Sequence, residues 1–455
     1  MVDIKSDSRK VNPGDTFIAI RNVARDGHDY IESAIEKGAT KIICEEGNYS
    51  VETVIVEDTR EYLNEYLYKN YYPKFSDMKF IGVTGTNGKT TTCYLIYQML
   101  TDLGKKCAYI GTIGFYYPGY KKELNNTTPD TDVLYEMFLE AKEAGCEYVV
   151  MEVSSHALDM NRIYGIEFDE VAFTNLTQDH LDYHKTLDNY ALAKQILFKR
   201  TRNKKIAIIN KDDPYYERFM LTDNNNITIS DNNGDVKILD IKFSNLGTTF
   251  SFEYEGSVLE TNINMVGRYN VYNYLTAFLL VKNLGFDTEE ILKLNETLGA
   301  PKGRMEMIKY GTNSIFVDYA HTPDAVINVL KNSLEYKEGN VITIVGCGGD
   351  RDRTKRPIMG HAAEMYSDYV IYTSDNPRTE DPKMIIDDIL EGVEKDNHEV
   401  ILDRKEAIIK GMSMLSDKDM LMILGKGHED YQIIGKEKIH FSDQEIVLEY
   451  IKEHE

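Results

Sequence analysis

The residues best suited to chemistry form one short run, Gly85-Thr86-Asn87-Gly88-Lys89-Thr90-Thr91. An apolar stretch at 80–84 precedes this run, and apolar residues at helical spacing follow it. Such a loop between a strand and a helix lets backbone N–H groups surround phosphate oxygens at the positive end of the helix. Lys89 is then placed to reach the terminal phosphates, and the hydroxyl of Thr90 to bind Mg²⁺. Val83 stands where the general phosphate-loop motif has glycine, so the motif is only partly met.

Three further groups could serve the same site. Glu152 closes a predicted strand at 148–153, and the carboxyl ends of parallel strands are where α/β sheets bind ligands. A carboxylate there could hold Mg²⁺, although a single strand-end glutamate is more often solvated. His180 follows another predicted strand and carries little information alone. Lys194, within a predicted helix at 190–198, would ordinarily be a surface lysine.

Three polar loops follow predicted strands in the last third of the chain. They are Gly346–Pro357, Asp375–Arg378 and Gly425–Gln432. Because such loops meet at one edge of a parallel sheet, their arginines and one acid should lie together. That mixture of charges suits an amino acid as substrate.

The spelling TGTNGKTTT at 84–92 resembles the ATP-dependent Mur ligases and their relatives, the folylpolyglutamate synthetases. The segments TNLTQDHLDYH (174–184), VDYAHTP (317–323) and DNPR (375–378) resemble the Mur ligases in particular. DNPR and GCGGDRD (346–352) argue against a folylpolyglutamate synthetase. The resemblance spans almost the whole chain.

The resemblance implies an amide-forming ligase of peptidoglycan precursor synthesis. ATP would phosphorylate the carboxylate of a UDP-N-acetylmuramoyl-dipeptide, and an amino acid would then attack the acyl phosphate. The implied catalytic residues are Lys89, Glu152, His180 and Lys194. The implied cofactors are ATP and Mg²⁺, with Lys194 carbamylated by CO₂. The implied metal ligands are Thr90, Glu152, His180 and the Lys194 carbamate.

Binding residues are carried over from the matching motifs in the same way. For ATP they are Gly85, Thr86, Asn87, Gly88, Lys89, Thr90, Thr91, Asn270, Asn273, Arg304, Asp318 and His321. For the acceptor they are Ser8, Asn126, Thr127, Thr128, Ser154 and Arg162. For the added amino acid they are Arg351, Asn376, Arg378, Gly425 and Glu429.

Arg378 predicts that the added amino acid is meso-diaminopimelate. This amino acid carries a distal carboxylate that lysine lacks, and a guanidinium binds a carboxylate with two parallel hydrogen bonds. The DNPR form also resembles the diaminopimelate-adding members of the family. Three alternatives stay open: an L-lysine-adding enzyme, a Mur-type paralogue with another acceptor, and a nucleotide-binding scaffold without activity.

The alternation of strand and helix patterns predicts an α/β protein with three domains. We expect a small α/β domain that binds the UDP-sugar at 1–73. A central phosphate-loop domain, with a parallel sheet and an antiparallel patch near 226–266, should occupy 74–300. A Rossmann-like domain that binds the amino acid should occupy 301–455. Members of the family usually carry a further stretch before the segment Asp7-Ser8-Arg9, so the first domain is expected to be shortened.

Composition excludes several classes of function. The net charge of −23 over 455 residues disfavours nucleic acid and anionic membrane as partners. The five cysteines show no paired spacing, which suits a reducing compartment. Because no signal-peptide pattern or long apolar stretch appears, we expect a cytoplasmic protein without a membrane span. We expect this protein to be a monomer.

Overall fold

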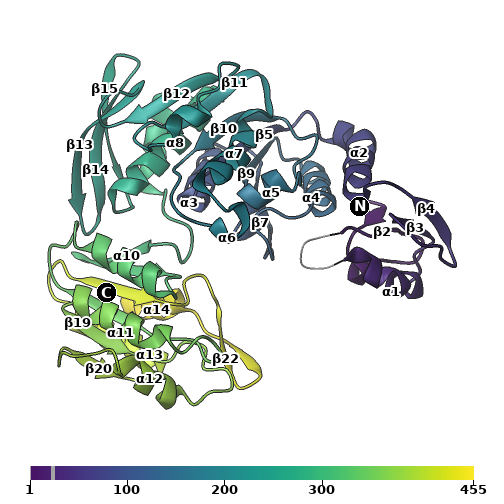
Figure 1. The fold of residues 1–455 in the computed structure, drawn as a ribbon. Coiled ribbons are helices and arrows are strands. Elements are labelled where there is room, and N and C mark those ends of the chain that lie inside the picture. The colour runs from purple at the N-terminus through teal and green to yellow at the C-terminus, as the bar shows by residue number, and fades with distance from the viewer. Residues whose placement is uncertain (1, 22–25, 455) are drawn as a thin grey trace. The chain divides into compact units, whose positions relative to one another are not determined.

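The computed structural model describes residues 2–21 and 26–454, with side chains at 203–205 left out. The chain divides into two compact units. Figure 1 labels the helices and strands and colours them by residue number. The first contains Met1–Ser230 and Leu275–Asp287, and the second contains Asp231–Tyr274 and Thr288–Glu455. Helix α8 (Arg268–Asn283) therefore carries the chain from the second unit back into the first.

The first unit begins with a parallel sheet of strand order β1-β2-β3-β4. Its strands are β1 (Ile4–Lys5), β2 (Thr16–Ile18), β3 (Lys41–Cys44) and β4 (Glu52–Ile55). Its helices are η1 (Ser8–Lys10), η2 (Gly27–Tyr30), α1 (Ile31–Glu36), α2 (Thr59–Tyr71) and η3 (Tyr72–Lys74). Helix α2 begins after Asp58, whose carboxylate accepts a hydrogen bond from the Glu61 amide, as capping requires.

A larger sheet of order β12-β11-β10-β5-β9-β6-β7-β8 follows in the same unit. It is parallel from β12 to β6, and β7 and β8 add an antiparallel edge. The strands are β5 (Lys79–Thr84), β6 (Cys107–Gly111), β7 (Gly114–Tyr117), β8 (Tyr120–Lys122), β9 (Tyr148–Glu152), β10 (Phe168–Phe173), β11 (Thr201–Asn210) and β12 (Asn225–Ser230). The helices are α3 (Lys89–Asp102), α4 (Thr131–Glu143), α5 (Ser155–Asp159), α6 (Leu181–His184), α7 (Leu187–Phe198) and η4 (Tyr216–Phe219).

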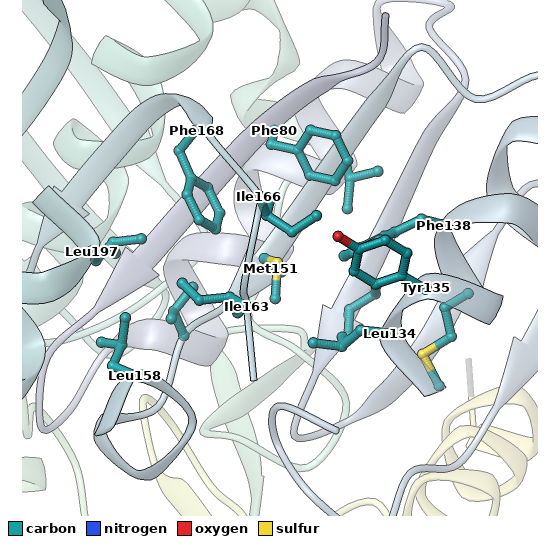
Figure 2. Packing of buried hydrophobic residues seen from close by; sticks show 14 of the residues in the cluster. Phe80, Leu134, Tyr135, Phe138, Met151, Leu158, Ile163, Ile166, Phe168 and Leu197 are labelled. Atoms are coloured by element: carbon teal, nitrogen blue, oxygen red, sulfur yellow. The ribbon is translucent and has the colours of Figure 1, made fainter. Parts of the chain in front are cut away.

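Aromatic and aliphatic side chains pack together in the core that contains Phe80 of β5 (Figure 2). The rings of Phe80 and Phe138 meet edge to face, with centroids 5.1 Å apart. Gly82 leaves room for a third ring, since a Cβ at this position would lie 2.7 Å from Phe168. Strands covered by helices on both faces read as continuous apolar runs, which is why the sequence marked β5 so clearly.

The second unit contains an antiparallel arrangement of β13 (Val236–Ser244), β14 (Gly247–Tyr254) and β15 (Ser257–Ile263). It also contains a sheet of order β16-β17-β21-β18-β19-β20, parallel except at β16, and a hairpin of β22 and β23. These strands are β16 (Glu306–Tyr310), β17 (Asn313–Asp318), β18 (Val341–Val345), β19 (Tyr369–Tyr372), β20 (His398–Val400), β21 (Met420–Leu424), β22 (Tyr431–Ile434) and β23 (Glu437–His440). The helices are α9 (Thr288–Lys293), η5 (Leu294–Glu296), α10 (Pro323–Ser333), α11 (Lys355–Tyr366), α12 (Pro382–Leu390), α13 (Arg404–Met414) and α14 (Asp443–His454).

The predicted α/β class with parallel and antiparallel parts is confirmed. The prediction missed β1, β4, β12 and β16 and the β7–β8 and β22–β23 hairpins, most of which are short and lie partly in polar sequence. Among the described residues, no helix is both long and apolar enough to cross a membrane.

A buried ion pair joins α13 to α14. The Arg404 guanidinium contacts both carboxylate oxygens of Asp443 at 2.8 Å, and both side chains are fully buried. Removing one partner of a buried pair leaves an uncompensated charge, which costs about 3–5 kcal/mol. We therefore predict that Asp443→Ala markedly lowers the urea midpoint for unfolding of the second unit.

The same two helices supply the matched control. Lys405 and Glu449 form an exposed pair at 3.6 Å, so Glu449→Ala should leave the midpoint unchanged. If both variants lower the urea midpoint equally, burial of the Arg404–Asp443 pair does not explain its contribution to stability.

Candidate active site

The phosphate loop leaves β5 and enters α3 through two glycines with positive φ. Gly85 has φ 151°, and a Cβ there would lie 1.9 Å from the Thr174 hydroxyl oxygen. Gly88, at φ 84°, is the residue before the first turn of α3. Only glycine adopts these conformations without strain, so these two positions allow the tight turn between β5 and α3.

The loop is held from the neighbouring strand by Asn175, which sequence reasoning missed. The Asn87 amide donates to the Asn175 side-chain oxygen at 2.9 Å, and the Asn175 Nδ2 donates back to the Asn87 carbonyl at 3.1 Å. The Thr86 amide donates to the Asn175 carbonyl at 2.8 Å. Asn175 thus binds the backbone of the loop through its own backbone carbonyl and through both polar atoms of its side chain. Asn175 lies two residues after β10, which neighbours β5 in the sheet. The signal available in the sequence was a polar residue just after a predicted strand.

Two lysines converge on one carbonyl of this loop. Lys89 Nζ donates to the carbonyls of Gly85 and Thr86 at 2.9 and 2.8 Å, and Lys194 Nζ donates to the same Gly85 carbonyl at 2.8 Å. Lys194 is only 1% exposed, so its interpretation as a surface lysine is wrong. Burial, and then the positive charge of Lys89, place the pKa of Lys194 well below its ordinary value.

Glu152 is completely buried at the end of β9, which also excludes a solvated strand end. One carboxylate oxygen, Oε1, accepts from the Tyr109 hydroxyl at 2.6 Å and from the Thr112 amide at 2.8 Å. The other, Oε2, accepts from the hydroxyls of Thr90 at 2.9 Å and Thr112 at 3.2 Å. The predicted metal ligands Thr90 and Glu152 are therefore in direct contact.

His180 caps α6 with a left-handed backbone, φ 52°, and its ring is about half exposed. The ring lies 4.8 Å from His156 and 6.1 Å from Tyr190 between centroids. Lys194 Nζ stands 4.3 Å above the same Tyr190 ring, so Tyr190 links the two predicted metal ligands. Burial lowers the pKa of His156.

These groups can hold Mg²⁺ only if water and substrate phosphates supply the other ligands. Within residues 2–21 and 26–454, no three His, Cys, Asp or Glu side chains are arranged to hold a metal ion. Mg²⁺ usually takes one or two carboxylates and fills its other positions with water and substrate phosphates. Glu152 and Thr90, beside a phosphate loop, fit that requirement.

The residues predicted for the acceptor form a connected group near Glu152. Thr128 accepts from the Ser154 amide at 3.0 Å, and its hydroxyl donates to the Glu152 carbonyl at 2.8 Å. Arg162 donates to the Thr128 carbonyl at 3.0 Å and pairs with Asp130 at 2.9 Å. Thr127 contacts the Thr112 hydroxyl at 3.0 Å, whereas Asn126 is exposed.

Ser8 lines a cavity of about 530 Å³ in the same unit. The cavity is also bordered by Arg9, Tyr30, Arg60 and Asp130. Since Asp130 pairs with Arg162, the cavity and the acceptor group described above share a wall.

All five residues predicted for the amino acid line one cavity of about 140 Å³ in the second unit. It lies where the loops after the neighbouring strands β18, β19 and β21 meet. The residues are Arg351, Asn376, Arg378, Gly425 and Glu429. The predicted meeting of the three loops is thus confirmed.

Hydrogen bonds within the protein hold the polar side chains of this cavity in place. Arg378, at φ 51°, donates from Nη1 to the Gly349 carbonyl at 2.8 Å. The Asn376 Nδ2 donates to Glu429 at 2.9 Å. Lys426, missed from the sequence, is fully buried and donates to both Asn376 and Glu429, at 3.3 and 3.2 Å.

Of the remaining residues predicted for ATP, Thr91 lies in α3 of the first unit and the others lie in the second unit. Asp318 accepts from the Met305 and Ala320 amides at 2.7 and 2.9 Å, and burial raises its pKa. Arg304 lies 5.5 Å from the centre of the Tyr319 ring. His321 Nδ1 lies 2.7 Å from the Tyr319 carbonyl oxygen. Asn270 and Asn273 stand one turn apart at the start of α8, where the Asn273 Nδ2 donates to the Asn270 side-chain oxygen at 3.1 Å.

Fold and site together define a phosphate-loop α/β protein that also has a small cavity lined by both basic and acidic side chains. Three family models match the chain: "Mur ligase family, catalytic domain" at 3–79, "Mur ligase middle domain" at 83–281 and "Mur ligase, glutamate ligase domain" at 303–427. The chain belongs to the Mur ligase family, as the motifs predicted.

Several relatives that match over almost the full length carry the same enzyme name. UDP-N-acetylmuramoyl-L-alanyl-D-glutamate–2,6-diaminopimelate ligase 1 of Clostridium acetobutylicum is 45% identical over 460 residues, covering 99% of this chain and 95% of the relative. The ligase of that name from Aquifex aeolicus is 42% identical over 452 residues, covering 98% and 93%. A solved structure of such a ligase has a TM-score of 0.76 at 33% identity and covers 99% of this chain and 94% of its own.

More distant structures share the fold alone. The MurF ligase of Thermotoga maritima in complex with ADP is 19% identical, with a TM-score of 0.60 and coverage of 99% and 96%. A Mycobacterium tuberculosis folylpolyglutamate synthase is 17% identical, with a TM-score of 0.59 and coverage of 81% and 92%.

Proposed function

We propose that this protein is an ATP-dependent ligase that adds meso-diaminopimelate to UDP-N-acetylmuramoyl-L-alanyl-D-glutamate. The observation that carries this function is the meeting of Arg351, Arg378 and Glu429 at one cavity, in a chain 40–45% identical to several ligases named for this reaction. The reaction would belong to peptidoglycan precursor synthesis in the cytoplasm. Residues 1–73, 74–300 and 301–455 would bind the UDP-sugar, ATP and the amino acid respectively.

The chemistry has two steps. The acceptor carboxylate attacks the γ-phosphorus of ATP, ADP leaves, and an acyl phosphate forms. The amine of the amino acid then attacks the acyl carbon, phosphate leaves from the tetrahedral intermediate, and the amine loses a proton as the amide forms. Lys89 would offset charge on the transferred phosphoryl group, together with the amides of the phosphate loop. Arg304, Asp318, His321, Asn270 and Asn273 would contact the nucleotide.

Mg²⁺ would be held by Thr90, Glu152, His180 and a carbamylated Lys194, and it would neutralise phosphate charge. The acceptor peptide would lie along Thr127, Thr128, Ser154 and Arg162, with Ser8 on the uridine side. Arg162 suits a carboxylate because Asp130 and the Thr128 carbonyl already fix the orientation of its guanidinium.

The first test is ligation itself. Release of phosphate from ATP should require both the UDP-dipeptide and meso-diaminopimelate. Lys89→Ala should lower this rate by about a hundredfold or more, because an ammonium group that stabilises the transition state is lost. Near-normal turnover, in a variant that circular dichroism shows to be folded, would exclude the assigned role.

The environment of Lys194 supports carbamylation. Two ammonium groups on the Gly85 carbonyl would repel each other, so Lys194 readily loses its proton. The neutral amine can attack the carbon of CO₂, and loss of a proton then leaves an anionic carbamate. This exchange replaces a cation that repels Mg²⁺ with oxygen ligands.

We predict that Lys194→Ala is nearly inactive and that a short carboxylic acid such as acetate partly restores its rate. Lys199→Ala is the control, since Lys199 is exposed at the end of the same helix. Both rates are measured by phosphate release. If acetate does not raise the rate of Lys194→Ala, or raises the rates of both variants by the same factor, the carbamate is contradicted.

Selectivity for meso-diaminopimelate would rest on Arg378 and Glu429. The guanidinium would bind the distal carboxylate, Glu429 and the Gly425 carbonyl would bind the distal ammonium, and Arg351 would bind the other carboxylate. With L-lysine, Arg378 would stay desolvated without a partner anion, which disfavours binding.

Competition assays should therefore give a much higher kcat/KM for meso-diaminopimelate than for L-lysine. Arg378→Ala should lower kcat/KM for diaminopimelate about tenfold or more and narrow this preference. Arg353→Ala, on the preceding loop and paired with Asp388 outside the cavity, is the control. An unchanged preference in Arg378→Ala would refute the assignment.

A further inference from the structure

Tyr109 has no part in the chemistry described so far, although it contacts the catalytic centre. It lies on β6, where it pairs in register with Val150 of β9. Its side chain is fully buried, and its hydroxyl donates to Glu152 Oε1 at 2.6 Å. A buried tyrosine hydroxyl needs a hydrogen-bond partner, and here that partner is a carboxylate, which makes the bond a strong one.

The two oxygens of Glu152 have different kinds of partner. Oε1 is bound by Tyr109 and by the backbone amide of Thr112, which can only donate. Oε2 is bound only by the hydroxyls of Thr90 and Thr112. A carboxylate has about four lone-pair positions, so all of them are used. A hydroxyl can rotate and offer its own lone pair to a cation, and a cation can therefore replace the donors at Oε2 but not the amide at Oε1.

Gly111 supplies an independent sign that this contact is built into the strand. A Cβ at position 111 would lie 2.3 Å from the Tyr109 hydroxyl oxygen and 2.3 Å from Glu152 Oε1. The φ of Gly111 does not lie in the left-handed region, so the backbone itself does not require glycine. Glycine is required because a larger side chain at position 111 would collide with both the Tyr109 hydroxyl and the Glu152 carboxylate.

We propose that Tyr109 is a positioning residue that, with the Thr112 amide, anchors Oε1 of Glu152 and thereby directs Oε2 and the Thr90 hydroxyl toward a divalent cation. This role rests on the metal site of the proposed function. Groups that orient a ligating carboxylate typically change metal affinity tenfold or more when removed.

The test is Tyr109→Phe, which keeps the ring and removes only the hydroxyl. Binding of Mn²⁺ to the ADP-saturated protein, followed by electron paramagnetic resonance, should weaken about tenfold. The Mg²⁺ concentration for half-maximal ligation should rise by a similar factor, while the KM for diaminopimelate stays unchanged. Gly111→Ala, which pushes the same two groups apart, should change Mn²⁺ affinity in the same direction.

Tyr116→Phe is the matched control. Tyr116 packs against Tyr109 with ring centroids 5.4 Å apart, but its hydroxyl donates to the Ile113 carbonyl and not to Glu152. Its Mn²⁺ affinity should equal that of the unaltered protein. Unchanged affinity in Tyr109→Phe, or an equal loss in both tyrosine variants, would overturn the role of Tyr109.

The proposed function fails in a different way. If the unaltered protein binds Mn²⁺ with ADP but does not ligate diaminopimelate, the substrate assignment is wrong and the effect of Tyr109 on metal affinity still stands. If the unaltered protein binds no Mn²⁺ with ADP, the metal site and the role of Tyr109 are both refuted.

Discussion

The centre of the first unit depends on a single carbonyl, that of Gly85, which accepts hydrogen bonds from both Lys89 and Lys194. Each lysine reaches it for a different reason: Lys89 begins the helix after the loop, and Lys194 projects from α7, which packs beside β5. Two like charges this close are unfavourable in a buried setting. The arrangement is stable when one of the two amines is uncharged, and Lys194 is the more deeply buried.

In the second unit, buried charged side chains are stabilised by ion pairs and hydrogen bonds. Lys426 is fully buried, yet its ammonium contacts both Glu429 and Asn376. These contacts leave the Asn376 amide with one orientation, because its oxygen also accepts from the Ile433 amide at 2.9 Å. The acid that faces the cavity is therefore held rigidly, and a rigid acid distinguishes ligands by where their ammonium lies.

Much of this arrangement could be predicted from the sequence. Continuous apolar runs identified β5, β9 and β10, and the polar residues after them identified the edge that carries Lys89, Glu152 and His180. Glu152 and Lys194 were predicted to be functional only through resemblance, since local sequence does not encode burial. Asn175 and Tyr109 were missed because each acts through a partner far away in the chain, and pattern reasoning does not find contacts between segments. Lys426 was missed because neither its burial nor its contact with Asn376 can be inferred from its own loop.

The bond between Asn175 and the phosphate loop has a consequence for cooperativity. Asn175 stands five positions before His180 on the same connection, and its side chain brackets the backbone of Asn87. Binding of phosphates that ordered the loop would therefore also order the segment that carries His180. Under the proposed function, a nucleotide on the loop and a divalent cation at His180 would share the entropic cost of that ordering, so each would raise the affinity of the protein for the other by the same factor. Such a linkage would need no change of shape, only a loss of motion along this connection.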